Sequence, residues 1–124
     1  MADSNELVST KPISPGQHAV LDYGVAATFF TLGMRYRGRN NAAAALAFIN
    51  GGLVLGMSMF TDYPGGIWRR LSFKTHRTLD AVQASLSALG PVVMGFGGSS
   101  EAKVFYSQAG SEVGVIAMTD WDAA

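Results

Sequence analysis

Cysteine is absent from this sequence, which excludes disulfide bonds, thiol catalysis and thiolate metal sites. The glycine-rich loops that bind phosphates and the Gly-x-Ser-x-Gly elbow of serine hydrolases are absent as well. Histidine occurs only twice, so most metalloenzyme designs lack the ligands that they need. We therefore expect no catalytic residues, no enzymatic activity, no resident metal and no cofactor.

Charged residues are also scarce, at 15% of the chain, against about 25% in an average soluble domain. The nine basic and nine acidic residues cancel, so no net positive field exists to attract a nucleic acid. We expect no nucleic-acid partner.

The few charges leave four long stretches almost free of them. These stretches are Pro15–Met34, Asn41–Thr61, Thr75–Phe96 and Glu101–Thr119. A helix needs about 20 mainly apolar residues to cross a bilayer. A soluble four-helix bundle would need a polar face on every helix, and the run Ala42–Ile49 has none. The sequence therefore predicts an all-α membrane protein with four transmembrane helices.

The chain divides into a polar N-terminal tail (1–14), a first two-helix repeat (15–63), an interfacial linker (64–75) and a second two-helix repeat (76–121). The tail lacks the apolar core of a signal peptide. Ser14, Pro15 and Gln17 form the pattern of a capped helix start. In the linker, three apolar residues (Ile67, Trp68 and Leu71) stand beside three basic ones (Arg69, Arg70 and Lys74), which predicts a short helix lying in the membrane interface.

The two repeats match each other without gaps at a shift of 58 residues. His18 and Asp22 recur as His76 and Asp80, and Thr61-Asp62-Tyr63 recurs as Thr119-Asp120-Trp121. Each repeat begins and ends on one side of the membrane, which predicts two hairpins related by a pseudo-twofold axis along the membrane normal. Five lysines and arginines on the side of the chain ends, against four on the other, favour both termini in the cytoplasm.

These features resemble the SPW-repeat family of small bacterial integral membrane proteins. The repeated unit opens with His-x-x-Leu-Asp and closes with Thr-Asp-Tyr, and the likeness covers both halves of the chain. The tripeptide that names the family is degenerate here, because Gly90-Pro91-Val92 keeps only its proline. The resemblance implies four spans in the bacterial inner membrane and no established catalytic activity.

The duplication gathers ionisable side chains at one membrane interface. These interfacial polar pairs are His18, Asp22, His76, Asp80, Asp62 and Asp120. In the simplest interpretation each aspartate near a helix start complements the positive helix end and holds the histidine one turn before it. Two alternatives are a metal or proton-relay cluster and ligation of a tetrapyrrole by His18 and His76.

A second set of residues is suited to packing against other helices or a partner. It comprises Gly52, Gly56, Gly110, Gly114, Gln108, Ser111 and Glu112. The Gly-x-x-x-Gly pairs allow helices to approach closely, and we expect most of that packing inside the bundle. A carboxylate inside a span costs about 2.5–3.5 kcal/mol, so Glu112 is expected to hydrogen-bond to another helix or another subunit, or alternatively to serve as a proton or ion site.

Basic and aromatic residues flank the predicted spans and suit contacts with lipid headgroups or a partner loop. They are Arg35, Arg37, Arg39, Trp68, Arg69 and Arg70. The whole pattern predicts a non-catalytic accessory or scaffold subunit of a larger bacterial membrane complex, respiratory or photosynthetic, whose partners are lipids and other integral membrane subunits. The first alternative is a small oligomeric proton- or ion-linked transporter that uses Glu112 and the His/Asp pairs. The second is a tetrapyrrole or pigment binder.

Overall fold

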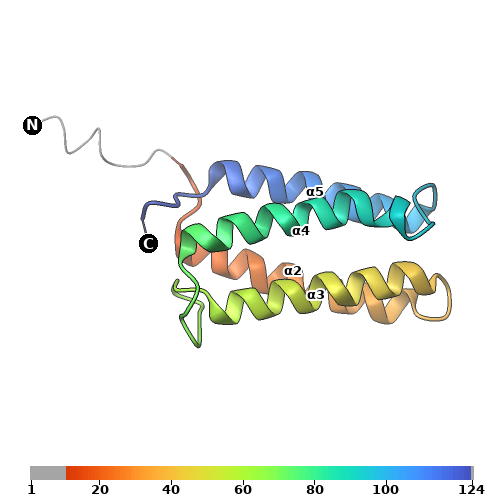
Figure 1. Ribbon diagram of the computed structural model, residues 1–124, viewed down its shortest axis with the longest axis horizontal. Helices are drawn as coiled ribbons and strands as arrows, with labels where there is room; N and C mark the ends of the chain where they lie inside the picture. Colours follow the sequence, from red (N-terminus) through yellow and green to blue (C-terminus); the bar gives the residue numbers. More distant parts are fainter. Residues whose placement is uncertain (1–10, 124) are drawn as a thin grey trace, which may run out of the picture.

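The computed structural model describes residues 11–123, which form four α-helices (Figure 1). They are α2 (Pro15–Tyr36), α3 (Asn41–Phe60), α4 (Phe73–Val93) and α5 (Ser100–Met118). No β-strand occurs among the described residues, where extended segments pair only in isolated bridges. The all-α prediction is confirmed. Residues 1–10 of the predicted N-terminal tail lie outside the described residues.

Each helix begins at a side chain that supplies a partner for the unpaired N–H groups of its first turn. The N-caps are Ser14, Asn40, Ser72 and Ser99. Gln17 completes the predicted capping box with Ser14. Helix α4 begins two residues before the predicted span because the Ser72 hydroxyl accepts the N–H of Thr75.

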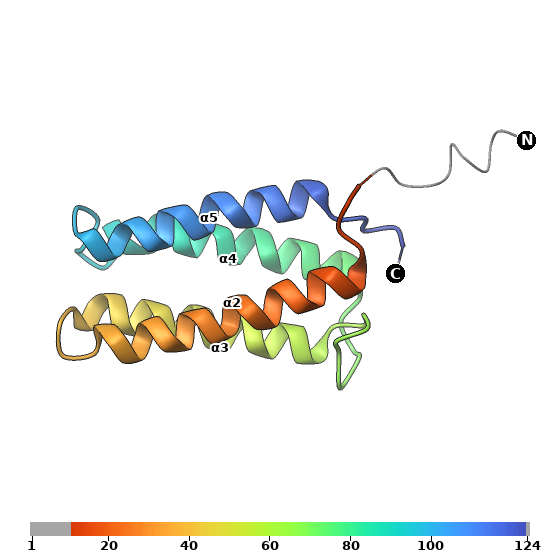
Figure 2. The ribbon, with the colours of Figure 1, turned by 180° about the vertical axis from the view of Figure 1, so that it is seen from behind.

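The helices pack as two antiparallel hairpins, α2–α3 and α4–α5, that lie against each other as two layers (Figure 1, Figure 2). The two hairpin loops lie at one end of the bundle. The α3–α4 linker, the start of α2 and the end of α5 lie at the other end. Helix α3 also packs directly on α4, so the two repeats share one interior.

The linker does not form the predicted interfacial helix. Its backbone folds back onto the end of α3, where the N–H of Ile67 donates to the carbonyl of Met59 and that of Leu71 donates to the carbonyl of Phe60, both at 2.8 Å. The last carbonyls of a helix have no partner within the helix. The linker N–H groups therefore donate to the carbonyls at the end of α3 and do not form a helix within the linker.

The sequence duplication recurs in the contacts at this end of the bundle. Thr61 and Leu71 form one parallel bridge, and Ile13 and Thr119 form the other. A shift of 58 residues converts Thr61 to Thr119 and Ile13 to Leu71. The two bridges are therefore equivalent under the duplication. In each, a residue that precedes one repeat pairs with a residue at the end of the other repeat.

The interior is divided between apolar and polar side chains. The main apolar cluster is built around Phe29, Leu46 and Phe105, which are at most 1% exposed. Buried polar side chains fill much of the remaining interior, among them those of His18, Asp22, Asn50, His76, Asp80, Gln83, Ser87 and Glu112. Because buried polar groups need partners, this interior is organised by hydrogen bonds as well as by packing.

Close helix contacts use glycines other than the predicted pairs. A Cβ atom at Gly90 would come within 2.7 Å of the Leu46 side chain, whereas Cβ atoms at Gly52, Gly56 and Gly110 would meet nothing within 4 Å. The prediction that the Gly-x-x-x-Gly pairs act mostly inside the bundle is therefore wrong. Their faces are open to the outside.

Helix α3 is the one helix in the described residues that is long and apolar enough to cross a membrane by length and composition. The other three carry more polar side chains, such as His18 and Asp22 in α2 and Gln83 in α4. The fold therefore shows the four predicted helices, and four transmembrane spans stay a prediction.

Candidate functional site

Four side chains from the two repeats meet inside the bundle, near the end that holds the linker. His18 and Asp22 come from the first turns of α2, and His76 and Asp80 come from the first turns of α4. One nitrogen or oxygen atom of each lies within 4.8 Å of the others, and all four side chains are buried. We call this set the His/Asp ring.

Histidine and aspartate alternate around the ring. His18 Nε2 lies 3.0 Å from Asp80 Oδ2 and 3.4 Å from Asp22 Oδ1. His76 Nε2 lies 3.0 Å from Asp22 Oδ2 and 3.2 Å from Asp80 Oδ1. The expected pairing of each histidine with the aspartate one turn later is present, but the shorter contact of each histidine crosses to the other repeat. The ring thus joins α2 to α4.

Two threonines fix the outer nitrogen of each imidazole. Thr61 Oγ1 lies 2.6 Å from His76 Nδ1, and Thr119 Oγ1 lies 2.9 Å from His18 Nδ1. Each hydroxyl donates its single proton, at 2.6 Å, to a carbonyl one turn earlier, so its oxygen accepts from the imidazole. Nδ1 therefore carries a proton in both rings, and Nε2 faces the carboxylates.

Aromatic side chains cover the ring. Tyr63 donates its hydroxyl proton to Asp22 Oδ2 at 2.8 Å, and Trp121, its counterpart in the second repeat, lies against His18 with ring centroids 5.0 Å apart. Burial of Tyr63, and in addition the negative charge of Asp22, raises the pKa of the Tyr63 hydroxyl above its usual value. The Tyr63 hydroxyl therefore keeps its proton and donates it in a hydrogen bond to the ring.

The hydrogen bonding of the ring is incomplete. His76 Nε2 and Asp80 Oδ1 are 3.2 Å apart and buried, yet neither makes a hydrogen bond that meets the requirements of direction as well as distance. Buried polar atoms without a partner are rare in folded proteins and destabilise them. These two atoms are therefore held by ion-pair contacts alone, since His76 Nε2 also lies 3.0 Å from Asp22 Oδ2.

The other two predicted interfacial aspartates lie outside the ring. Asp62 is exposed and Asp120 is partly buried. The backbone N–H of Asp62 donates to the Leu71 carbonyl, and that of Asp120 donates to the Ile13 carbonyl. Their backbones thus hold the two bridges, and the expected gathering of six ionisable groups is reduced to four.

An amide network continues from the ring along the bundle interior. Gln83 lies one turn after Asp80 on α4, and its Nε2 donates to Asn50 Oδ1 at 2.8 Å and to Gln108 Oε1 at 3.0 Å. The network joins α3, α4 and α5. Gln108, predicted to pack against another helix or a partner, thus hydrogen-bonds to Gln83 of α4.

Glu112 lies one turn after Gln108 on α5 and is only 5% exposed. It lies beside Asp80, and its Oε2 has no hydrogen-bond partner. Ser111, next to it, is exposed. Within the predicted packing set, Gln108 and Glu112 thus turn inward. The members that reach the surface fully or in part are Gly52, Gly56, Gly110, Gly114, Ser111 and, at its edge, the half-buried Gln108.

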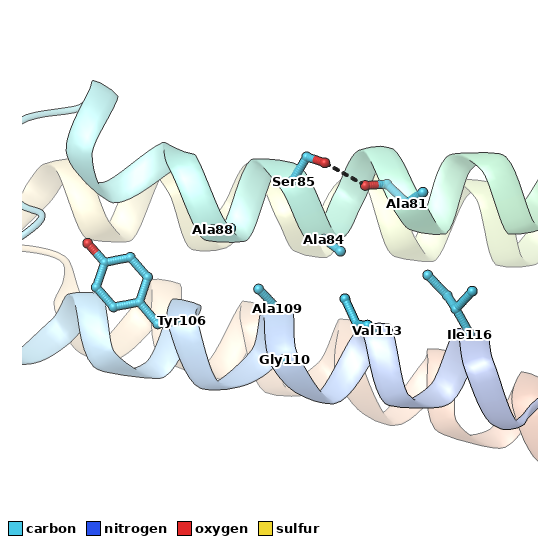
Figure 3. Close-up of a pocket in the computed structure, with 9 residues that line it drawn as sticks. All are labelled: Ala81, Ala84, Ser85, Ala88, Tyr106, Ala109, Gly110, Val113 and Ile116. Atoms are coloured by element: carbon cyan, nitrogen blue, oxygen red, sulfur yellow. Dashed lines mark hydrogen bonds between the residues drawn. The ribbon is translucent and has the colours of Figure 1, made fainter.

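An apolar groove of about 570 Å3 runs between α4 and α5 (Figure 3). Its walls are made mostly of small residues, including Ala81, Ala84, Ser85, Ala88, Ala109 and Gly110. Tyr106 lies at one end and Ile116 at the other. The Ser85 hydroxyl donates to the carbonyl of Ala81 in its own helix. The groove therefore suits close packing of another backbone against its small residues, rather than binding of a polar ligand.

The predicted headgroup residues are exposed at both ends of the bundle. Arg35, Arg37 and Arg39 lie at the α2–α3 loop. Trp68, Arg69 and Arg70 lie in the linker at the opposite end. Both bundle ends therefore carry basic side chains.

Sequence reasoning missed the threonines and Tyr63 as parts of the site. The signal was present, because Thr61 and Thr119 recur at the same 58-residue shift as the histidines. It also missed Asn50 and Gln83, which stand in otherwise apolar or small-residue stretches. The tetrapyrrole alternative gains no support, since the two imidazoles are fully buried with centroids 5.2 Å apart.

No protein-family model matches the chain, and neither a curated protein nor a solved structure matches it. The likeness to SPW-repeat proteins stays a prediction.

Proposed function

We propose that this chain is an integral membrane protein with four transmembrane helices, and that it serves as a non-catalytic subunit of a larger membrane complex. The observation that carries the first part is the distribution of polarity between interior and surface. From Val20 to Met34, along the whole of α3, from Ala81 to Val93 and from Val104 to Met118, no exposed residue is charged. The charged residues in these segments, Asp22 and Glu112, are buried.

The outer faces of these segments carry large apolar side chains instead, among them Val20, Ile49, Val82, Val93 and Val113, each more than half exposed. A soluble bundle has the opposite arrangement, with apolar residues inside and charges outside. In hydrocarbon, polar groups must be satisfied within the protein and apolar groups can face the solvent. The low hydropathy of α2, α4 and α5 thus arises partly from side chains that lipid would not meet.

Helix lengths agree with this proposal. The four helices contain 19 to 22 residues, which at about 1.5 Å per residue gives about 28–33 Å, close to the thickness of a bilayer core. The arginines at both bundle ends would then lie at headgroup level. The approximate twofold axis would run along the membrane normal, with both chain ends on the cytoplasmic side of a bacterial inner membrane.

The groove between α4 and α5 supports the second part of the proposal. Its small residues allow another helix backbone to approach closely, as in helix pairs within membranes. We propose that it receives a transmembrane helix of another subunit. The pair Gly52, which is exposed, and Gly56, which is partly exposed, offers a second face of the same kind on α3.

Purification in a mild detergent followed by native mass spectrometry tests the subunit role. We expect stoichiometric partner proteins with the wild type. Gly110→Leu fills the groove and should release the partner without unfolding the chain, because a Cβ at Gly110 meets no other atom within 4 Å. Gly24→Leu is the matched control, since Gly24 is equally open on α2. A wild type that runs alone as a symmetric oligomer contradicts the proposal.

A small proton- or ion-linked transporter is the second candidate. It is favoured by the buried Glu112, whose Oε2 lacks a partner and which lies beside Asp80 of the ring. Flux in proteoliposomes that is abolished by Glu112→Gln would favour this candidate. If the wild type shows no flux and Glu112→Gln still binds its partner, the subunit role is favoured over the transporter role.

A further inference from the structure

The His/Asp ring has the composition and the spacing of a metal site. We propose that it binds one divalent transition-metal ion, expected to be Zn2+, through Nε2 of His18 and His76 and one oxygen each of Asp22 and Asp80. The expectation from sequence was that no metal is bound. The inference depends on the geometry of the ring and holds whether or not the chain crosses a membrane.

The spacing of the ligand atoms fits a tetrahedral ion. Zinc binds imidazole nitrogen and carboxylate oxygen at about 2.0–2.2 Å, which places neighbouring ligands of a tetrahedron about 3.3–3.5 Å apart. The four nitrogen–oxygen contacts of the ring measure 3.0, 3.0, 3.2 and 3.4 Å. These contacts use both oxygens of each carboxylate, and one nitrogen or oxygen of each of the four residues lies within 4.8 Å of the others. Each aspartate would turn one oxygen toward the ion as the ring closes around it.

The surroundings of the ring prepare its ligands. Imidazoles that bind metals typically donate the other ring N–H to an outer partner, which fixes the tautomer and the ring orientation. Thr61 and Thr119 accept these protons from the two Nδ1 atoms, which directs Nε2 inward. Tyr63 orients Asp22 in the same way through its hydrogen bond.

The incomplete hydrogen bonding of the ring agrees with this inference. His76 Nε2 and Asp80 Oδ1 are buried and contact the ring only in ion pairs, without a well-directed hydrogen bond, and an ion between them would bind both atoms. Two aspartates also neutralise a divalent ion, so the occupied site would place no net charge in the interior. Nitrogen and oxygen ligands together favour a transition metal over calcium or magnesium, which take oxygen ligands alone.

The position of the site indicates a structural role. Four protein ligands leave no open coordination position, as in structural zinc sites. Tyr63, Phe73 and Trp121 cover the ring at the end of the bundle. An ion held by His18 and Asp22 of the first repeat and by His76 and Asp80 of the second would clamp α2 to α4.

Zinc titration of the full chain tests the proposal. The protein is purified in mild detergent, stripped with a chelator and titrated with Zn2+, and bound zinc is measured by mass spectrometry after desalting. We expect one zinc per chain, and intense visible absorption when Co2+ replaces it. Asp80→Asn should lose the ion, whereas Asp62→Asn, an exposed aspartate outside the ring, should keep it.

Two further variants test the site without removing a proposed ligand. Thr61→Val and Thr119→Val remove the outer partners of the imidazoles and should weaken zinc binding about 10–100-fold. Thr31→Val is the matched control, because Thr31 makes the same bond to a carbonyl one turn earlier but is exposed and contacts no histidine. Zinc affinity unchanged in both ring variants overturns the proposal. So does a helical, monodisperse wild type that binds no zinc, which would show a ring held by ion pairs only.

Discussion

Tyr63, just after the end of α3, hydrogen-bonds to the His/Asp ring from outside it. Its side chain is 2% exposed, and its hydroxyl donates to an aspartate that also contacts both histidines. A single hydroxyl thus connects the end of the first repeat to the site shared by both repeats.

Tyr63→Phe removes this donor and leaves one Asp22 oxygen without it. A hydrogen bond to a charged group contributes about 1.5–3 kcal/mol, so the free energy of unfolding should fall by about that amount, measured by denaturant titration in detergent. Tyr106→Phe is the control, because the Tyr106 hydroxyl bonds to a carbonyl at an exposed position, and its loss should cost less than about 1 kcal/mol. Equal effects of the two variants would contradict the importance assigned to Tyr63.

The pairs of the ring and their gathering at one end of the helices were predictable, but the contacts between the two repeats were not. The spacing of His18 and Asp22 places them on one helix face, and the 58-residue shift duplicates them. The contact between His18 and Asp80 joins positions far apart in the chain, and no local pattern predicts it. It follows from the packing of the two hairpins, which brings the starts of α2 and α4 together.

At the scale of secondary-structure elements, the helices were predictable because charge is scarce along them away from their ends, apart from Asp22, Asp80 and Glu112. The linker was not. Its mixed apolar and basic residues predict an interfacial helix, yet the carbonyls of Met59 and Phe60 at the end of α3 require partners and take the N–H groups of Ile67 and Leu71. Backbone hydrogen bonding therefore outweighs the amphipathic pattern.

Gly66→Ala tests this account of the linker. A Cβ atom at Gly66 would overlap the carbonyl oxygen of Thr61, a backbone atom that cannot rotate aside. We expect a loss of about 1–3 kcal/mol, as for other overpacked sites, and faster proteolysis between residues 62 and 72. Gly98→Ala, in the α4–α5 loop with nothing within 4 Å, should have little effect. If both variants melt at the wild-type temperature, the linker is not packed as described.

At the scale of the whole molecule, two hairpins enclose an interior of apolar and polar side chains. Their outer faces carry no charge from Val20 to Met34, along α3, from Ala81 to Val93 and from Val104 to Met118, and we call these faces the uncharged belt. The sequence predicts the belt, since long stretches lack charge. It does not predict which polar residues turn inward. Glu112, Gln108 and the exposed Ser111 all lie on α5. Only the packing of α5 against the bundle decides which of these polar side chains face the interior and which face outward.

The central claim is that lipid surrounds this belt, and fractionation without detergent tests it most directly. Cells that express the full chain are lysed in buffer, membranes are sedimented and washed with alkaline carbonate, and the protein is followed in each fraction. We predict that the chain stays with the membranes until detergent extracts it. A helical, monodisperse chain recovered from the detergent-free supernatant would contradict the account.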